Sequence, residues 1–147
     1  MNYRYPLQKL VDLKANEKSQ AEWMLSKAIG RLQVEQSTLD KLESERHTVH
    51  DSMIQQTAQA ARISDLLQMH SYMNHLDEQI HRKHQDVLFA RQGVTNMQDQ
   101  LTEKMKEEKV WVKAKERARD RFLTVVRKKE QDEMDEIAAV RRMELIK

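Results

Sequence analysis

Two pairs of histidines in this 147-residue chain have a spacing with which each pair could share a metal ion. His47 with His50, and His81 with His84, stand three residues apart, a spacing that puts both imidazoles on one face of a helix. Two ligands are weak support for a metal, and neither pair belongs to a Glu-x-x-His motif of the kind that helical di-metal sites use. The pairs are interpreted as part of a solvated helix face, and no metal is expected.

The carboxylates between Glu130 and Glu136 could suggest general acid–base chemistry or a divalent cation. Consecutive residues point around a helix, however, and a two-stranded rod has no pocket in which the pKa of a carboxylate could be shifted. Gly30 and Gly93 are the glycines of the chain, so neither a phosphate-binding loop nor a dinucleotide fingerprint can be formed. We expect no catalytic residue, no cofactor and no enzymatic activity.

A mainly basic stretch from Lys104 to Arg127 contains Trp111 and Phe122 and could suggest binding to nucleic acid. Both aromatic residues fall on the apolar repeat described below, and the acids within the stretch form i, i+4 pairs with the bases. The formal net charge of the whole chain is only +2. A solvated helix face is the favoured interpretation, and no nucleic acid partner is expected.

Composition limits both the fold and the compartment. With 39% apolar and 34% charged residues, 2 Gly and 1 Pro, the chain favours long helices over a multilayer core. The absence of cysteine rules out disulfides and fits a reducing compartment. The sequence has no apolar run long enough to span a membrane, and its start lacks the apolar region of a secretory signal. We therefore expect a cytoplasmic protein with no direct membrane insertion.

The elements that carry these residues are set by an apolar repeat. Stepping alternately by three and four residues from Leu66 to Ile146 meets mostly apolar side chains, and the same steps run from Leu7 to Met53. A heptad repeat of this kind makes a helix supercoil around a partner, because an untwisted helix would turn its stripe away from the contact. The repeat is lost between residues 55 and 64, where Ser64 before Asp65 is a good helix N-cap.

The sequence therefore predicts an all-α fold in which two long helices form an antiparallel coiled-coil hairpin, the second helix longer than the first. A single hairpin takes in residues 1–147, with helix one at about 6–54, the turn at about 55–64 and helix two at about 65–146. Past about residue 115 the second helix has no expected partner in its own chain, although its apolar stripe continues. A helix with an unpaired apolar stripe is marginal alone, so this overhang is expected to bind another protein.

The register of the hairpin follows from the repeat. In an antiparallel pair an a position meets a d position, which allows registers that differ by one heptad. The preferred register places Leu25 beside Met97. It also makes Lys18 face Lys104 and puts Arg46 in the seam, from which long basic side chains can reach solvent. A slip by one heptad remains an alternative.

Three stretches of the chain resemble one known family. The opening YRYPLQKLVDLKANEKSQAE, the middle LLQMHSYMNHLDEQI and the tail KKEQDEMDEIAAVRR are similar to the FliJ family, the small coiled-coil protein of the bacterial flagellar type III export apparatus. The resemblance covers essentially the whole chain and is strongest to members from Gram-positive bacteria. It implies a non-enzymatic component of that apparatus, cytoplasmic and held peripherally at the cytoplasmic face of the cell membrane.

The resemblance implies two main partners, each with its own contact surface. A stalk of this family inserts the end carrying both chain termini into a hexameric export ATPase, FliI, and promotes its assembly and activity, while the start of the second helix contacts the export gate protein FlhA. The residues expected at the ATPase contact, here named the terminal surface, are Leu10, Leu13, Glu17, Lys18, Arg117, Arg119, Phe122, Arg127, Met134, Asp135 and Glu136. The residues matched to the gate contact, here named the turn-proximal surface, are Tyr72, Leu76, Gln79 and Lys83.

Members of the family also escort export chaperones, a role for which no residue of this chain is singled out. The chain is expected to be a monomer within the complex. The alternative function is a generic coiled-coil adaptor or self-associating scaffold, because an apolar overhang could also bind a second copy. The two hypotheses differ in the solution mass and in the stimulation of the ATPase.

Overall fold

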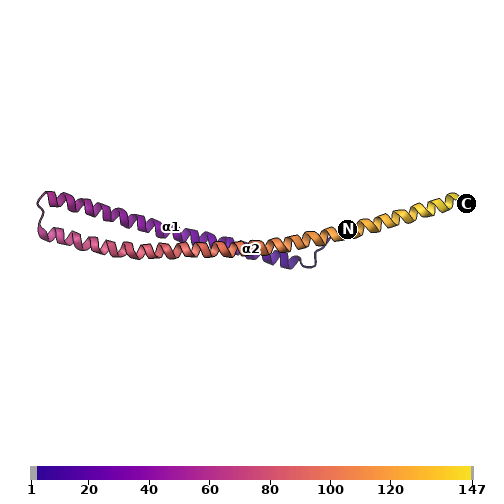
Figure 1. The fold of residues 1–147 in the computed structure, drawn as a ribbon, viewed down its shortest axis with the longest axis horizontal. Coiled ribbons are helices and arrows are strands. Elements are labelled where there is room, and N and C mark those ends of the chain that lie inside the picture. Colours follow the sequence, from indigo (N-terminus) through magenta and orange to yellow (C-terminus); the bar gives the residue numbers. More distant parts are fainter. Residues whose placement is uncertain (1–2, 147) are drawn as a thin grey trace. The chain divides into compact units, whose positions relative to one another are not determined.

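The computed structural model describes residues 3–146, which form two α-helices, α1 (Gln8–Ala58) and α2 (Ile63–Ile146). Within this range no residue belongs to a β-strand. The two helices lie next to each other on the same side of the turn that joins them, and their chains run in opposite directions (Figure 1). The predicted all-α antiparallel hairpin, with the second helix longer than the first, is confirmed.

The start of α1 is a tight turn around Pro6. The Gln8 amide donates to the Tyr5 carbonyl oxygen at 3.1 Å, and the Leu10 amide donates to the Leu7 carbonyl oxygen at 3.0 Å. Proline suits this position because its fixed φ is close to helical and its missing amide would have no partner in the first turn. The regular helix begins at Gln8, slightly later than the position of about 6 expected from the sequence.

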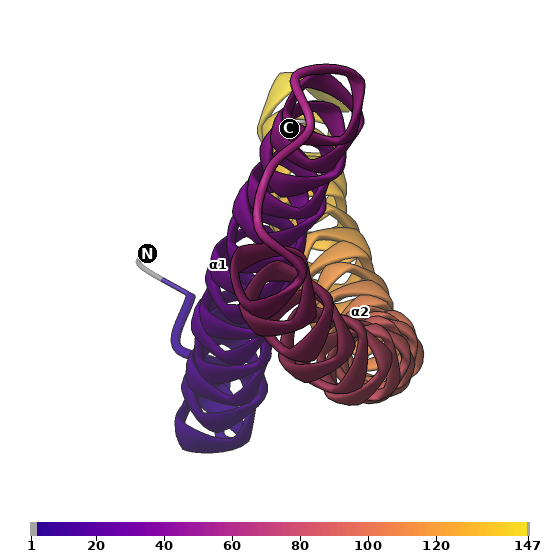
Figure 2. The ribbon, with the colours of Figure 1, turned by 90° about the vertical axis from the view of Figure 1, so that its left-hand side faces the viewer.

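The end of α1 is a Schellman motif, in which amides beyond the helix bond back to carbonyls of its last turn. The Ala61 amide donates to the Gln56 carbonyl oxygen at 3.0 Å, and the Ala60 amide donates to the Thr57 carbonyl oxygen at 3.4 Å. Ala60 has the left-handed conformation that this motif requires, with φ 55°. The chain then crosses to α2 in the turn that faces the viewer in Figure 2. The reversal thus forms without the glycine that usually holds this position.

The first turn of α2 begins earlier than the sequence predicts. The Arg62 carbonyl oxygen accepts hydrogen bonds from the amides of Asp65 at 3.1 Å and Leu66 at 3.2 Å, so Arg62 is the N-cap residue and Ile63 opens the helix. The prediction that Ser64 caps α2 is therefore wrong. The compact Schellman motif reverses the chain within residues 59–62, inside the expected turn but shorter, and Ser64 is already helical.

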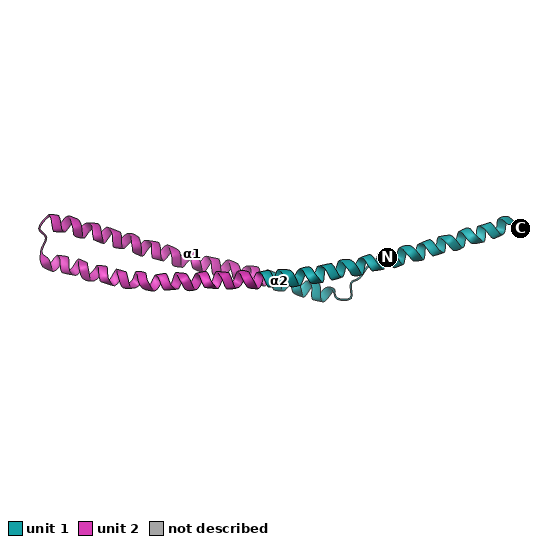
Figure 3. Ribbon diagram, in the orientation of Figure 1, with its two compact units in different colours: residues 1–19, 102–147 teal, residues 20–101 magenta. Residues whose placement is uncertain are grey.

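The described chain divides into two compact units, coloured separately in Figure 3, and unit 2 comprises residues 20–101. Its buried side chains are Leu39, Met73, Leu76, Val87 and Ala90, all of which are stations of the predicted apolar repeat. Leu76 is the least exposed, with 1% of its surface accessible. The core of unit 2 is therefore a narrow seam along the two helices, as a heptad repeat dictates.

Unit 1 comprises residues 1–19 and 102–147, of which 3–19 and 102–146 are described. Val11 is buried in this unit, whereas every residue from 127 to 146 is exposed. The ring of Tyr3 lies 5.0 Å from the ring of Phe122, centroid to centroid. We expected α2 to have no partner in its own chain past about residue 115. This expectation is wrong for the part of α2 up to Phe122, because Tyr3, in the segment before α1, packs against Phe122.

Ion pairs between the helices show the register inside each unit. In unit 1, Lys104 Nζ lies 3.3 Å from Glu17 Oε2, and in unit 2 Arg46 binds Asp77. In an antiparallel pair, residues that face each other have nearly the same sum of residue numbers throughout. The sums for these two ion pairs differ by one from the sum for Leu25 and Met97, the pair expected in the preferred register. The structure therefore has the preferred register, and a slip by one heptad is excluded.

Candidate protein-interaction surfaces

Four charged side chains of unit 1 form an alternating cluster where α1 meets α2. Lys14 Nζ lies 3.1 Å from Glu107 Oε2 and 3.4 Å from Glu17 Oε2, while Lys104 Nζ lies 3.3 Å from Glu17 Oε2 and 3.6 Å from Glu107 Oε2. The hydrogen bond to Glu107 raises the pKa of Lys14, and the same bond lowers the pKa of Glu107. Each cation is thus shared by two carboxylates, and we name these four residues the ion cluster.

The ion cluster changes what was expected of Glu17 and Lys18. Sequence alone placed Lys18 opposite Lys104, a like-charge layer in the seam. In the structure Glu17 binds Lys104, and Lys18 Nζ lies 3.5 Å from Glu108 Oε1. Both residues of the terminal surface are thus engaged within unit 1, and a contact with a partner would have to share or break these pairs.

The remaining members of the terminal surface are more accessible. Arg117, Arg119 and Arg127 are exposed, and Met134 exposes 67% of its surface. Phe122 is only partly accessible because the Tyr3 ring lies against it. The other members fall on α1, where Leu13 is exposed and Leu10 half-buried, and on the far part of α2, where Glu136 is exposed and Asp135 accepts a hydrogen bond from Gln131.

The turn-proximal surface has two members with opposite environments. Tyr72 exposes 42% of its surface, and its hydroxyl donates a hydrogen bond to Glu45 of α1, which raises the pKa of Tyr72. Leu76, one helical turn further on, exposes 1% and lies in the seam. The Tyr72 ring is therefore available to a partner, whereas Leu76 supports the hairpin beneath it.

Lys83 and Gln79 complete the turn-proximal surface on α2. Lys83 Nζ lies 2.8 Å from Glu35 Oε2 of α1 and 3.5 Å from Asp86 Oδ2, and the hydrogen bond to Glu35 raises the pKa of Lys83. Gln79 is half-buried. Lys83 thus forms an ion pair between the two helices, and part of its side chain remains accessible to solvent.

Sequence reasoning missed the acidic partners on α1, Glu35 and Glu45. Both stand within a residue of the predicted seam, which is where interhelical charges of a coiled coil are found. Once the register is known, that position is the signal that could have identified them. The surface that faces a partner beside Tyr72 therefore includes a carboxylate as well as an aromatic ring.

The histidine pairs are used in other ways in the structure. His47 Nε2 lies 3.4 Å from Asp51 on its own helix, and His84 Nε2 lies 3.4 Å from Glu43 across the hairpin. Within residues 3–146 no three side chains of the metal-binding types gather at one place. No helix in that range has a stretch apolar and long enough to cross a membrane.

Taken together, a narrow buried seam and interhelical ion pairs define a two-helix coiled-coil protein with exposed apolar and charged side chains along both helices. Comparison with known proteins identifies the family to which this coiled-coil protein belongs. The sequence pattern of the family described as "Flagellar FliJ protein" matches residues 3–144, and the chain belongs to that family. It is thus a component of a type III export apparatus.

Two relatives show how far the similarity extends. The flagellar FliJ protein of Bacillus subtilis (strain 168) is 24% identical over 138 residues, which are 94% of this chain and 94% of the relative. A solved structure of a YscO homolog, CT670 from Chlamydia trachomatis, superposes with a TM-score of 0.72 at 25% identity. That match covers 95% of this chain and 94% of the other. Both matches run over nearly the whole length of each protein.

Proposed function

We propose that this chain is the non-catalytic stalk of a flagellar export apparatus, which inserts into the hexameric export ATPase and links it to the export gate. The observation that carries the proposal is the exposed end of α2, where every residue from 127 to 146 is accessible although the helix is continuous. A helix that keeps its regular form beyond its own partner needs another surface to pack against. Membership of the FliJ family makes an export ATPase the first candidate for that surface.

Charge on the terminal surface supports a protein ring as the partner. Arg117, Arg119 and Arg127 are exposed beside the partly accessible Phe122, and the acidic run from Glu130 to Glu136 follows them. Neighbouring blocks of opposite charge fix the orientation of a partner and steer its approach while the net charge stays small. Such an arrangement suits the lining of a protein ring better than a lipid or nucleic acid surface, which would attract a single sign of charge.

The test is steady-state ATP hydrolysis by the purified flagellar export ATPase with and without this chain. We expect the wild-type chain to raise turnover, and we expect the double variant Arg119→Glu with Arg127→Glu to lose that stimulation. The matched control is Arg62→Glu with Arg82→Glu, the same charge change at two exposed arginines of unit 2. Circular dichroism should give the same helix content for all three proteins.

A truncation after Lys128 tests the exposed end directly. It removes only residues that make no buried contact, so the helix pair should stay folded while stimulation is lost. Full stimulation by both the truncated chain and the arginine variant would show that the terminal surface is not the ATPase contact. The self-associating scaffold would then be the better hypothesis, and analytical ultracentrifugation should show a dimer in place of the expected monomer.

We further propose that Tyr72 is the anchor of the gate contact on the turn-proximal surface. It is the exposed aromatic residue there, and a buried aromatic anchor is the type of side chain on which binding energy concentrates. Leu76 serves by holding the helix, since it is buried in the seam. Export as a whole would then occur at the cytoplasmic face of the membrane, where the gate lies.

Binding to the cytoplasmic part of the gate protein tests this assignment. Tyr72→Ala should weaken binding by at least about 2 kcal/mol, whereas Tyr72→Phe keeps the ring and loses only the hydrogen bond to Glu45. The matched control is Leu67→Ala, at an exposed apolar residue on the same part of α2. Equal binding by the wild-type chain and Tyr72→Ala in isothermal titration calorimetry would refute Tyr72 as the anchor.

A further inference from the structure

Unit 2 contains an open hollow between α1 and α2 that shares no residue with the terminal or turn-proximal surface. Its volume is about 390 Å³. Its walls and floor come from both helices: Met24, Lys27, Ala28, Arg31, Phe89, Ala90, Gly93 and Met97. The hollow is therefore a feature of the paired helices and not of either helix alone.

Small residues form the floor of the hollow. Ala28 of α1 faces Ala90 and Gly93 of α2 there, where most of the seam has larger side chains. A Cβ atom placed on Gly93 would meet no atom within 4 Å. Glycine is an unfavourable residue inside a helix, so Gly93 weakens α2 while it leaves room for another element to approach the backbone.

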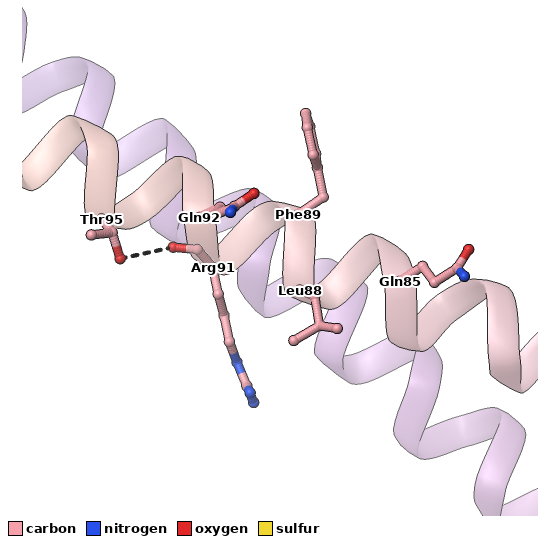
Figure 4. A pocket seen from close by; sticks show the side chains of 6 residues that line it. All are labelled: Gln85, Leu88, Phe89, Arg91, Gln92 and Thr95. Atoms are coloured by element: carbon pink, nitrogen blue, oxygen red, sulfur yellow. Dashed lines mark hydrogen bonds between the residues drawn. The ribbon is translucent and has the colours of Figure 1, made fainter.

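Apolar side chains that reach solvent form the walls. Phe89 exposes 65% of its surface and Met24 exposes 48%. Figure 4 shows a neighbouring pocket on α2, in which Phe89 and Leu88 leave the helix in different directions. Leu88, 61% exposed, lines that pocket and does not line the hollow. One exposed apolar residue is ordinary, but two large ones on either side of a hollow give the hollow apolar walls that a partner can contact.

Two cations stand at the rim, and their neighbours are aromatic rings. Lys27 Nζ lies 4.3 Å from the centre of the Trp23 ring, and Arg31 Cζ lies 5.9 Å from the centre of the Phe89 ring. Neither cation forms an ion pair within residues 3–146, in contrast to Lys83, which binds Glu35. No acidic residue lines the hollow. The rim therefore carries positive charge that a partner can neutralise.

The spacing of the two cations indicates the shape of the ligand. Lys27 and Arg31 are four residues apart, so they stand one turn of α1 from each other. Carboxylates one turn apart on a second helix would match them, and the groove between two packed helices accepts a third helix through its apolar face. Nucleic acid is disfavoured, because two cations around an apolar floor neutralise few phosphates.

We propose that the hollow is a docking groove for an amphipathic helix of a partner protein, whose apolar side chains enter between Met24 and Phe89 and whose carboxylates pair with Lys27 and Arg31. The acidic run from Glu130 to Glu136 in a second copy is a poorer occupant. Its acids are nearly consecutive and surround the helix, which leaves no separate apolar face. The groove is thus a third contact surface, independent of the ATPase and of the gate.

The probe is a fluorescein-labelled synthetic helix of about three heptads, with leucine at every a and d position and glutamate at every e and g position. Its twin carries lysine in place of each glutamate. Fluorescence anisotropy with the full-length chain should show at least about tenfold tighter binding of the acidic peptide than of its twin. The double variant Lys27→Glu with Arg31→Glu should reverse that preference.

Phe89→Ala removes a wall and Gly93→Leu fills the floor, so each should weaken the acidic peptide by about tenfold. Leu88→Ala is the matched control, at the adjacent apolar residue of similar exposure that does not line the hollow, and should bind as the wild type does. Circular dichroism confirms that each variant folds. No binding of the acidic peptide, equal loss in Leu88→Ala and Phe89→Ala, tighter binding of a single-stranded oligonucleotide, or self-association of the chain abolished by Phe89→Ala would each overturn the proposal.

Discussion

Replacing Ala60 by glycine should make the protein more stable, although most glycine substitutions in helical proteins do the opposite. Ala60 holds the left-handed position of the Schellman motif at the end of α1, with φ 55°. An L-residue with a Cβ atom pays about 1 kcal/mol or more in that conformation, because the Cβ approaches the following carbonyl oxygen. Glycine has no such clash.

The size of the gain is the difference between two terms. Relief of the left-handed conformation contributes about 1 to 2 kcal/mol, and the greater freedom of glycine in the unfolded chain costs about 0.5 to 1 kcal/mol. The net expectation for Ala60→Gly is a stabilisation of about 0.5 to 1 kcal/mol. For a chain of this length that corresponds to a rise in Tm of roughly 2 °C.

The matched control is Ala58→Gly, the same chemical change two residues earlier, in the last turn of α1. There the backbone is helical, so glycine brings only its cost, and stability should fall by about 0.5 kcal/mol. Urea denaturation followed by circular dichroism measures both variants. If Ala60→Gly is neutral or destabilising, or if the two variants shift stability in the same direction, the left-handed assignment of Ala60 is wrong.

Three further predictions concern the stability of the hairpin. Leu76→Ala should cost about 2 to 4 kcal/mol in guanidinium denaturation because Leu76 is the most deeply buried residue, whereas Leu88→Ala at an exposed position should change stability by less than about 0.5 kcal/mol; equal effects would contradict the seam. The Glu107 pKa lies below its ordinary value of 4.5, so its ion pair stabilises the fold at neutral pH and this stabilisation is lost as pH falls through the lowered value. The pKa values of Lys14 and Lys83 lie above 10.5, so the stabilisation from their ion pairs is lost as pH rises through these raised values. Tm should be highest between these limits, and Glu107→Gln should reduce the decline of Tm at acid pH. Gly30→Ala should stabilise by about 0.5 to 1 kcal/mol, since the added Cβ meets no atom within 4 Å, and an unchanged Tm would count against an ordinary helical backbone there.

The seam of the hairpin could be predicted from the sequence because a heptad repeat has few structural solutions. Four buried residues lie on the two apolar heptad repeats that were found in the sequence: Val11, Leu39, Leu76 and Val87. The register also followed, since only shifts by seven keep a positions against d positions. For long, regular helices the pattern of apolar residues is itself a description of the contact.

The turn could not be located as well, because its signals are weak in the sequence. A glycine in the left-handed position is the usual sequence signal of a Schellman motif, but in this chain that position is occupied by Ala60. Ser64 before Asp65 looked like the start of α2, but a serine in the first helical turn gives the same local pattern as a serine at the cap. Local sequence preferences were enough to place the turn within residues 55–64, but not to identify the residues at which α1 ends and α2 begins.

The ion-pair partners of the charged side chains could not be predicted from the sequence either. Lys18 and Lys104 looked like opposed cations, and the repeat alone contained no sign that Glu17 and Glu108 would accept them. The side chains of lysine and glutamate are long and can choose among several neighbours, so their pairing depends on three-dimensional distances of a few Å. The same holds for Tyr72, whose link to Glu45 joins residues far apart in the chain.

The ion cluster of Lys14, Glu17, Lys104 and Glu107 has a mechanical consequence. If α1 slid along α2 by one heptad toward one side, Lys104 would leave Glu17 and meet Leu10, and Lys14 would leave Glu107, so each of the four groups would lose its partner on the other helix and keep the one on its own helix. An apolar seam of similar residues resists such sliding only weakly, because one leucine replaces another. The charged layer therefore opposes such sliding more than an apolar layer does, and it favours transfer of a push or twist from one helix to the other.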